Sequence, residues 1–187
     1  MRILCYGDSN TYGYDPRSFT GDRYASEHRW TDLSFPGHTV LNAGENGRSV
    51  PFRPHEFALV HSLTERYAPI DRMIVMLGTN DLLQGRTPEE TCARMEMFLS
   101  QLPGIPLFLL APPPMQRGVW VEDDSLVAAS LRLAQLYRML ADRLTIPFAD
   151  AGAWQLEITF DGVHLSEAGH KTLAAGLAAA LKQKEIL

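Results

Sequence analysis

A serine, an aspartate and a histidine of this chain stand in settings that could support nucleophilic catalysis. Ser9 follows the apolar run 2–6, and a short strand that empties into a tight turn can hold a hydroxyl exposed on a rigid base. A serine hydroxyl is a poor nucleophile until a histidine takes its proton, and that histidine needs an acceptor on its other ring nitrogen. Asp161 precedes His164 in one loop-like stretch. The predicted chemistry is acyl transfer, with Ser9 as nucleophile, His164 as general base and Asp161 as its orienter.

Acyl transfer also needs donors for the negative charge that develops on the carbonyl oxygen. We expect this oxyanion hole to be formed by the backbone N–H groups of Ser9 and Gly47 and by the side-chain amide of Asn80. A carboxylate in place of Asn80 could not donate a hydrogen bond.

The elements that must position these residues alternate between short apolar runs and helix patterns. Strands are predicted at 2–6, 39–43, 73–77, 107–111 and 146–149. Between them lie an irregular stretch at 11–29, a short helix at 29–33 and longer helices that open at Pro54, after Thr87 and at about Ser125, and a last helix follows Ser166. This alternation favours a three-layer α/β/α sandwich with a five-stranded parallel sheet in flavodoxin-like order.

The polar candidates follow the predicted strands. Ligands of open α/β sheets bind beyond the carboxyl ends of the strands. Ser9 follows the first strand, Gly47 the second and Asn80 the third, while Asp161 and His164 lie beyond the fifth. We therefore expect these five residues to meet at one edge of one sheet.

The composition is that of an ordinary soluble globular protein. A length of 187 residues indicates a single domain over 1–187, with 45% apolar and 21% charged residues. The net charge of −5 and the lack of a basic run argue against nucleic-acid binding. No apolar stretch approaches the roughly 20 residues of a membrane span, and no secretory signal is visible, so we expect a cytoplasmic protein. Cys5 and Cys92 are expected to be reduced.

Four short blocks resemble those of the SGNH hydrolases, also called GDSL-type esterases. The blocks are GDSN at 7–10, the stretch 42–47, GTND at 78–81 and DGVH at 161–164. The Ser, Gly, Asn and His that name the family map to Ser9, Gly47, Asn80 and His164. Gly47 is preferred to Gly44 because the oxyanion glycine of the family lies five residues after the asparagine that Asn42 matches.

One residue departs from the family pattern, since Asn10 stands where the family name implies leucine. The form GDSNTYG with a later Arg-Trp is similar to the small arylesterase and acyltransferase branch. The resemblance implies an α/β/α fold and hydrolysis of small carboxylic esters, with short acyl chains, without a metal or other cofactor. The expected partner is a small ester substrate, and whether the chain also forms a homo-oligomer stays open.

Other interpretations of the same residues stay open. Asp8 and Asp81 are interpreted as braces of their turns, and Tyr12, Trp30, Trp154 and Phe160 as candidates for the substrate pocket because they flank the site in sequence. A carbohydrate deacetylase would use the same chemistry, and a non-catalytic binding module could use the same fold. A metallohydrolase built on the aspartates and His164 lacks a clustered histidine motif, and a nucleotide site lacks a glycine-rich signature.

Overall fold

The computed structural model describes residues 1–18, 20–102 and 104–187, and its centre is one parallel sheet. The strands are β1 (Arg2–Gly7), β2 (Thr39–Gly44), β3 (Arg72–Met76), β4 (Leu107–Ala111) and β5 (Phe148–Asp150). Their spatial order is β2-β1-β3-β4-β5, with every neighbouring pair parallel. The predicted five-stranded, flavodoxin-like sheet is therefore confirmed.

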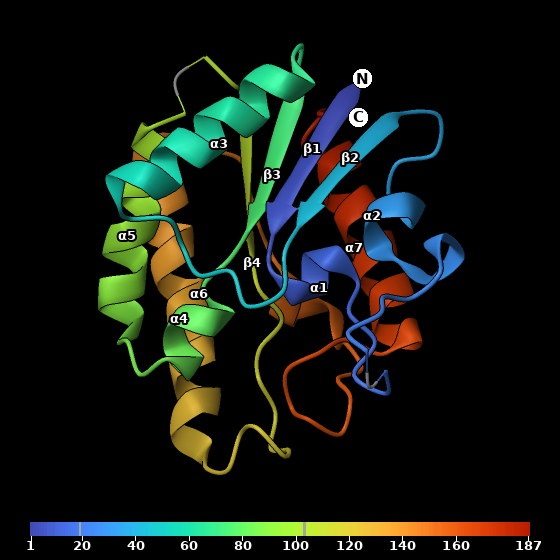
Figure 1. Ribbon diagram of the computed structural model, residues 1–187, viewed down its shortest axis with the longest axis vertical. Coiled ribbons are helices and arrows are strands. Elements are labelled where there is room, and N and C mark those ends of the chain that lie inside the picture. Colours follow the sequence, from blue (N-terminus) through green and yellow to red (C-terminus); the bar gives the residue numbers. More distant parts are fainter. Residues whose placement is uncertain (19, 103) are drawn as a thin grey trace.

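Helices cover both faces of the sheet, as Figure 1 shows. The helices α3 (Pro54–Tyr67), α5 (Pro88–Ser100) and α6 (Asp124–Leu144) lie on one face, and α2 (Trp30–Leu33) and α7 (Glu167–Gln183) lie on the other. Short helical turns follow three of the strands: α1 (Ser9–Tyr12), α4 (Thr79–Leu83) and the 3₁₀ turn η2 (Ala151–Trp154). A second 3₁₀ turn, η1 (Ser26–His28), precedes α2.

The strand side chains alternate between two buried cores. Leu4 and Tyr6 of β1 belong to the core under α5 and α6, whereas Ile3 and Cys5 belong to the core under α7. This two-sided burial is the reason that the strands read as continuous apolar runs. Cys5 and Cys92 are both free.

Capping residues fix where the long helices begin. The Thr87 side chain accepts a hydrogen bond from the Glu90 N–H and the Glu90 carboxylate accepts one from the Thr87 N–H, so the predicted capping box is present. Ser166 caps α7 through the Gly169 N–H at 3.0 Å. The inward stripe of α7 is formed by Leu173, Leu177 and Leu181, all buried.

The predicted bounds of the first four strands agree with the structure to within one residue, and two other stretches differ more. The last strand begins at Phe148 rather than at 146, because Thr145 takes a left-handed conformation at the end of α6 and the Ile146 N–H still bonds to the Ala141 carbonyl. The stretch 11–29 is also more ordered than predicted: it contains the end of α1, the turn η1 and a bridge between Tyr14 and Arg23.

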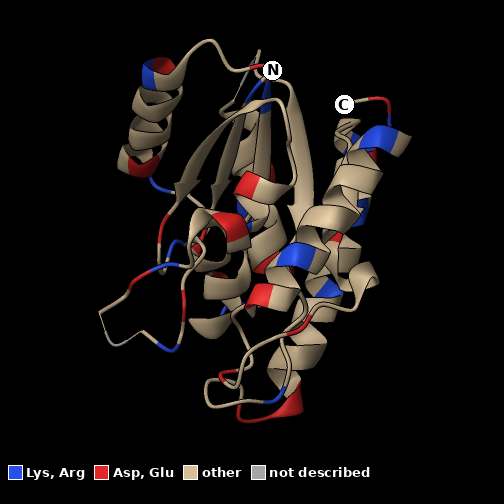
Figure 2. Cartoon of the chain, turned by 90° about the vertical axis from the view of Figure 1, so that its right-hand side faces the viewer, with Lys and Arg blue, Asp and Glu red and all other residues tan. Residues whose placement is uncertain are grey.

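Charged residues do not gather in one region of the chain. Figure 2 shows basic and acidic segments interspersed along the helices and loops in its view. Among the described helices, none is both long and apolar enough to cross a membrane.

Candidate active site

Three side chains form a continuous line at the carboxyl edge of the sheet. Ser9 Oγ lies 2.9 Å from His164 Nε2, and His164 Nδ1 lies 2.7 Å from Asp161 Oδ2. All three residues are buried, with exposed fractions of 7%, 3% and 2% for Ser9, His164 and Asp161. The structure therefore brings together the hydroxyl, imidazole and carboxylate that the sequence singled out.

Ser9 is positioned by the sharp turn from β1 into α1. Asp8 caps α1 by accepting the Asn10 N–H at 2.9 Å. Gly7 leaves room for α1 to fold back onto the strand, since a Cβ at that position would lie 2.0 Å from Thr11 Oγ1. Burial raises the pKa of Asp8 to about 6, against lowering contributions from the Asn10 N–H and the charges of His164 and Arg48. Asp8 thus acts as the predicted turn brace and does not contact the imidazole of His164 by hydrogen bond.

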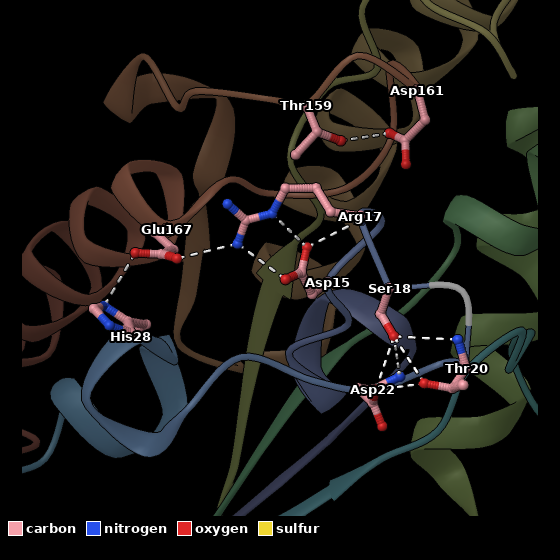
Figure 3. Close-up of polar contacts among 9 residues, drawn as sticks. All are labelled: Asp15, Arg17, Ser18, Thr20, Asp22, His28, Thr159, Asp161 and Glu167. Carbon is pink, nitrogen blue, oxygen red and sulfur yellow. Dashed lines mark hydrogen bonds and ion pairs between the residues drawn. The ribbon is translucent and has the colours of Figure 1, made fainter.

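Asp161 is held in an ionised state by the loop that it starts. Its Oδ1 accepts hydrogen bonds from the Val163 N–H, the His164 N–H and the Thr159 hydroxyl, each at 2.9 Å, and Figure 3 shows the last of these. Burial raises the pKa of this carboxyl, but the hydrogen bonds from His164 and Val163 outweigh burial and lower the pKa to about 2. The carboxylate can therefore fix the tautomer of His164 over the whole neutral range.

Asn10 joins the two ends of the chain at the site. Its side-chain Nδ2 donates to the Val163 carbonyl at 3.1 Å, and its side-chain Oδ1 accepts the Leu165 N–H at 2.9 Å. A leucine, which the family name implies at this position, could make neither bond. The departure from the family pattern thus has a structural function: it ties the turn of Ser9 to the loop of His164.

The expected oxyanion donors line one cavity of about 280 Å³ together with Ser9 and His164. Gly47 has a left-handed backbone with φ of 77°, and Asn80 donates one of its two amide hydrogens to the Arg48 carbonyl at 3.0 Å. Among the described residues, the backbone N–H groups of Ser9 and Gly47 have no hydrogen-bond acceptor. They are free to donate to a bound substrate.

The structure shows which of the two glycines, Gly47 or Gly44, can serve as a donor in the cavity. The Gly44 N–H donates to Asn42 Oδ1 at 2.9 Å, and a Cβ at Gly44 would lie 2.1 Å from the Tyr12 backbone nitrogen. Gly44 is therefore needed for packing of α1 against β2, and Gly47 is the glycine that faces the cavity.

The four aromatic residues expected at the pocket lie elsewhere, so that prediction is corrected. The Trp30 indole is buried under α1 and donates to the Asn10 carbonyl at 2.8 Å. The Tyr12 ring lies beneath the Arg23 guanidinium, and Trp154 packs against Gly176 of α7. Phe160 is 63% exposed. Nearness in sequence to Ser9 or His164 did not decide which way these rings point.

Two other aromatic side chains flank the imidazole. The Tyr14 ring centroid lies 4.7 Å from that of His164, and the Trp120 centroid lies 5.1 Å from it, edge to face. Both line the cavity, and the rest of the wall is formed by Asn46, Leu83 and Val163 with the residues named above. Trp120 follows β4 at the same sheet edge as the other site residues, so the strand-end rule could have found it.

Backbone hydrogen bonds join the loop that carries Trp120 to the loop that carries His164. The Trp120 N–H donates to the Asp161 carbonyl at 3.0 Å and the Gln116 N–H to the Gly162 carbonyl at 2.9 Å. A Cβ at Gly118 would lie 2.4 Å from the Gly162 backbone nitrogen, so glycine permits the close approach. The Trp120 ring and the His164 imidazole are thereby held in fixed relative positions.

Tyr14 is held by contacts of its own segment. Its backbone pairs with Arg23, and Arg17 bonds both to Asp15 at 2.9 Å and to Glu167 at the start of α7 at 3.1 Å (Figure 3). These ion pairs are exposed, so we expect each to stabilise the segment only slightly.

In the part of the chain that the structure describes, no three His, Cys, Asp or Glu side chains lie close enough to hold a metal ion together. Asp8, Asp81 and Asp161 serve instead as hydrogen-bond acceptors for backbone N–H groups.

The serine, histidine and aspartate in line at the carboxyl edge of the sheet have the arrangement that acyl transfer from an ester requires. The model of the GDSL-like Lipase/Acylhydrolase family matches residues 5–172, and the chain belongs to this family. It is a carboxylic ester hydrolase.

Solved structures agree with this assignment. The aryl esterase of M. smegmatis is 27% identical with a TM-score of 0.82, and the match covers 100% of this chain and 99% of that one. Est24, a carbohydrate acetylesterase from Sinorhizobium meliloti, gives the same identity of 27%, TM-score of 0.82 and coverage of 100% and 99%. A member of the lipolytic G-D-S-L family from Veillonella parvula, at 19% identity and a TM-score of 0.74 over 98% of this chain and 97% of that one, shares the fold. No curated protein sequence gives a significant match.

Proposed function

We propose that the protein is a serine esterase that hydrolyses short-chain carboxylic esters through an acyl-Ser9 intermediate. The observation that carries this proposal is the unbroken line from Asp161 Oδ2 through the His164 ring to Ser9 Oγ, with contacts of 2.7 and 2.9 Å. These lengths are those of hydrogen bonds through which a proton can pass.

The reaction follows from this line. As Ser9 Oγ attacks the ester carbonyl carbon, His164 Nε2 accepts the hydroxyl proton and Asp161 stabilises the imidazolium. The carbonyl oxygen becomes an oxyanion that accepts hydrogen bonds from the N–H groups of Ser9 and Gly47 and from the free amide hydrogen of Asn80. The bond to the alcohol oxygen breaks as His164 returns the proton to it. A water molecule then attacks the acyl-Ser9 carbonyl while His164 accepts its proton. The bond to Ser9 Oγ breaks as His164 returns the proton to that oxygen, which releases the carboxylic acid and restores Ser9.

The cavity indicates the kind of ester. It measures about 280 Å³, and among the described residues its wall carries no acidic or basic side chain apart from His164. A small, uncharged wall favours neutral esters with short acyl groups. Because His164 must reach the alcohol oxygen, the alcohol lies beside the two rings that flank the imidazole, Tyr14 and Trp120. Flat, apolar alcohols match these rings best.

The solved relatives include an aryl esterase and a carbohydrate acetylesterase, so aryl esters and acetylated sugars are the two substrate classes to compare. We would measure kcat/KM for p-nitrophenyl esters from acetate to octanoate and for acetylated oligosaccharides. We expect the highest kcat/KM at acetate or propionate and lower values for longer acyl chains. Faster release of acetate from the oligosaccharides would place the enzyme with the carbohydrate acetylesterases instead. The absence of turnover on every ester would contradict the proposal.

A further inference from the structure

The loop between β2 and α3, residues 45–53, is anchored in the core by Val50, which is buried, whereas the segment that carries Gly47 is not. Gly47 lines the cavity of Ser9 and His164, and it also lines a second cavity of about 620 Å³. Glu45, Asn46 and Gly47 are all exposed. Contacts of the residues that follow, among them the Arg48 guanidinium that donates to the Gly7 carbonyl at 2.8 Å, must therefore fix the direction of the Gly47 N–H.

Two consecutive residues of α4 hold the loop just after Gly47. Asn80 Nδ2 donates to the Arg48 carbonyl at 3.0 Å, and Asp81 Oδ2 accepts the Val50 N–H at 2.8 Å. The two bonds hold the loop backbone at Arg48 and Val50. The donor of one oxyanion hydrogen bond, Asn80, and the loop that carries another are thereby fixed to the same helical turn.

Asp81 is suited to this role by its surroundings. It is fully buried, and its second oxygen faces the guanidinium groups of Arg94 at 3.5 Å and Arg86 at 3.9 Å. The Arg94 guanidinium also covers the Phe52 ring at 3.6 Å from its centroid. A buried carboxylate persists only where cations and donors compensate for lost hydration. Asp81 and its cationic partner therefore contact the same loop at two points, Val50 and Phe52.

We infer that Asp81 is a positioning residue for the oxyanion hole, which keeps the Gly47 N–H aimed at the substrate carbonyl oxygen by holding Val50 and, through Arg94, Phe52. This inference rests on the proposed function. It adds to the turn-brace interpretation of the sequence a defined effect on catalysis. Because the oxyanion forms only in the transition state, loss of Asp81 should act on kcat more than on KM.

A thionoester provides a readout that general loosening of the fold would not move. In a thionoester the developing charge lies on sulfur, which is larger and a weak hydrogen-bond acceptor. The N–H donors of the hole therefore assist the oxygen ester far more than the sulfur ester. Damage to the hole should lower the ratio of the oxoester rate to the thionoester rate, whereas damage to the line of Ser9, His164 and Asp161 should lower both rates together.

The test compares wild type, Asp81→Ala and Asp71→Ala on an oxoester and a thionoester with the same acyl and alcohol groups. Asp71 is a matched control, because its Oδ2 accepts the Arg2 N–H at 2.6 Å at the opposite end of the sheet. We expect Asp81→Ala to lower the oxoester kcat by about 10- to 100-fold, with a smaller loss for the thionoester and little change in KM. Asp71→Ala should leave the ratio of the two rates at its wild-type value.

Folding of each variant is checked by circular dichroism. If Asp81→Ala does not fold, Arg94→Met takes its place, since it keeps the carboxylate and removes the nearer of its two guanidinium partners, and the same fall of the ratio is expected. A folded variant with the wild-type ratio overturns the inference, whether both rates are unchanged or both fall equally. Wild-type enzyme that hydrolyses neither ester, or Ser9→Ala that retains both rates, would overturn the proposed function instead of the role of Asp81.

Discussion

Ser9 Oγ and His164 Nε2 lie 2.9 Å apart although the two residues are separated by 155 positions in the chain. Ser9 follows β1, the first strand of the chain, and His164 precedes α7, its last helix. Parallel strands bring their carboxyl ends to one edge, and Asn10 bonds the two segments directly through the Val163 carbonyl and the Leu165 N–H. The proposed chemistry depends on this contact and on the groups that orient it.

Asp161→Asn tests the orienting role of the carboxylate. An amide at this position can present a donor instead of an acceptor to His164 Nδ1, which favours the wrong tautomer. We expect kcat for p-nitrophenyl acetate to fall by about 10⁴-fold with a nearly unchanged fold. Asp150→Asn is the control, since Asp150 accepts the Gly152 N–H in a similar turn outside the site. A fall of less than about tenfold in folded Asp161→Asn would contradict the assigned role.

Asn80→Ala tests the side-chain donor of the oxyanion hole. Removal of one such donor should lower kcat by about 10²- to 10³-fold and leave KM nearly unchanged. Gln84→Ala at the end of the same helical turn serves as the control and should retain wild-type kinetics. Equal kcat values for Asn80→Ala and wild type would remove Asn80 from the hole.

Trp120→Ala tests the alcohol side of the cavity. The indole lies edge-on to His164 and is half exposed, so it can cover an apolar alcohol. Its loss should lower kcat/KM for phenyl acetate by about tenfold, since partial burial of an aromatic side chain contributes about 1.5 kcal/mol, and should change ethyl acetate hydrolysis much less. Phe160→Ala removes a neighbouring exposed ring that does not line the cavity and should preserve both rates. Equal losses on the two esters in Trp120→Ala would argue against this placement.

Asp8→Asn tests how the ionisation of Asp8 changes the free energy of unfolding with pH. Burial raises the pKa of Asp8 from 3.8 to about 6 in the folded chain. Between these pH values the unfolded chain loses the Asp8 proton while the folded chain keeps it, so the free energy of unfolding falls as the pH rises. Above about pH 6 the ionised carboxylate should cost about 3 kcal/mol. Asn cannot ionise and can still accept the Asn10 N–H.

The free energy of unfolding from urea titrations at pH 4 and pH 8 measures this effect. Asp8→Asn should gain stability relative to wild type at pH 8 and show little gain at pH 4. A larger gain at pH 4 than at pH 8 would show that the sign is wrong.

The sequence predicted the parts of the fold that local signals determine. The apolar run 107–111 and the capping box of Thr87 and Glu90 depend on neighbouring residues, and both are confirmed. The placement of Ser9, Gly47, Asn80 and His164 around one cavity followed from a topological rule about strand ends.

Side-chain direction in loops could not be predicted in this way. Trp30 and Trp120 each follow turns near the site, but the first is buried against Asn10 and the second faces the cavity. Their directions are set by long-range contacts, such as the bond from the Trp120 N–H to the Asp161 carbonyl. The Val50–Asp81 bond is another contact of this kind, since no local pattern marks a backbone N–H that meets a carboxylate 31 positions away.

The most direct test of the central claim is covalent labelling of Ser9 by a fluorophosphonate, followed by intact-protein and peptide mass spectrometry. The reagent reacts with a serine hydroxyl only when a base removes its proton, so it reports on the contact between Ser9 and His164. We expect wild type to gain one adduct, located on Ser9, with a much slower reaction in His164→Ala and none in Ser9→Ala. Wild-type protein that stays unlabelled, or that carries its adduct on another residue, would contradict the account and favour a non-catalytic binding protein on this fold.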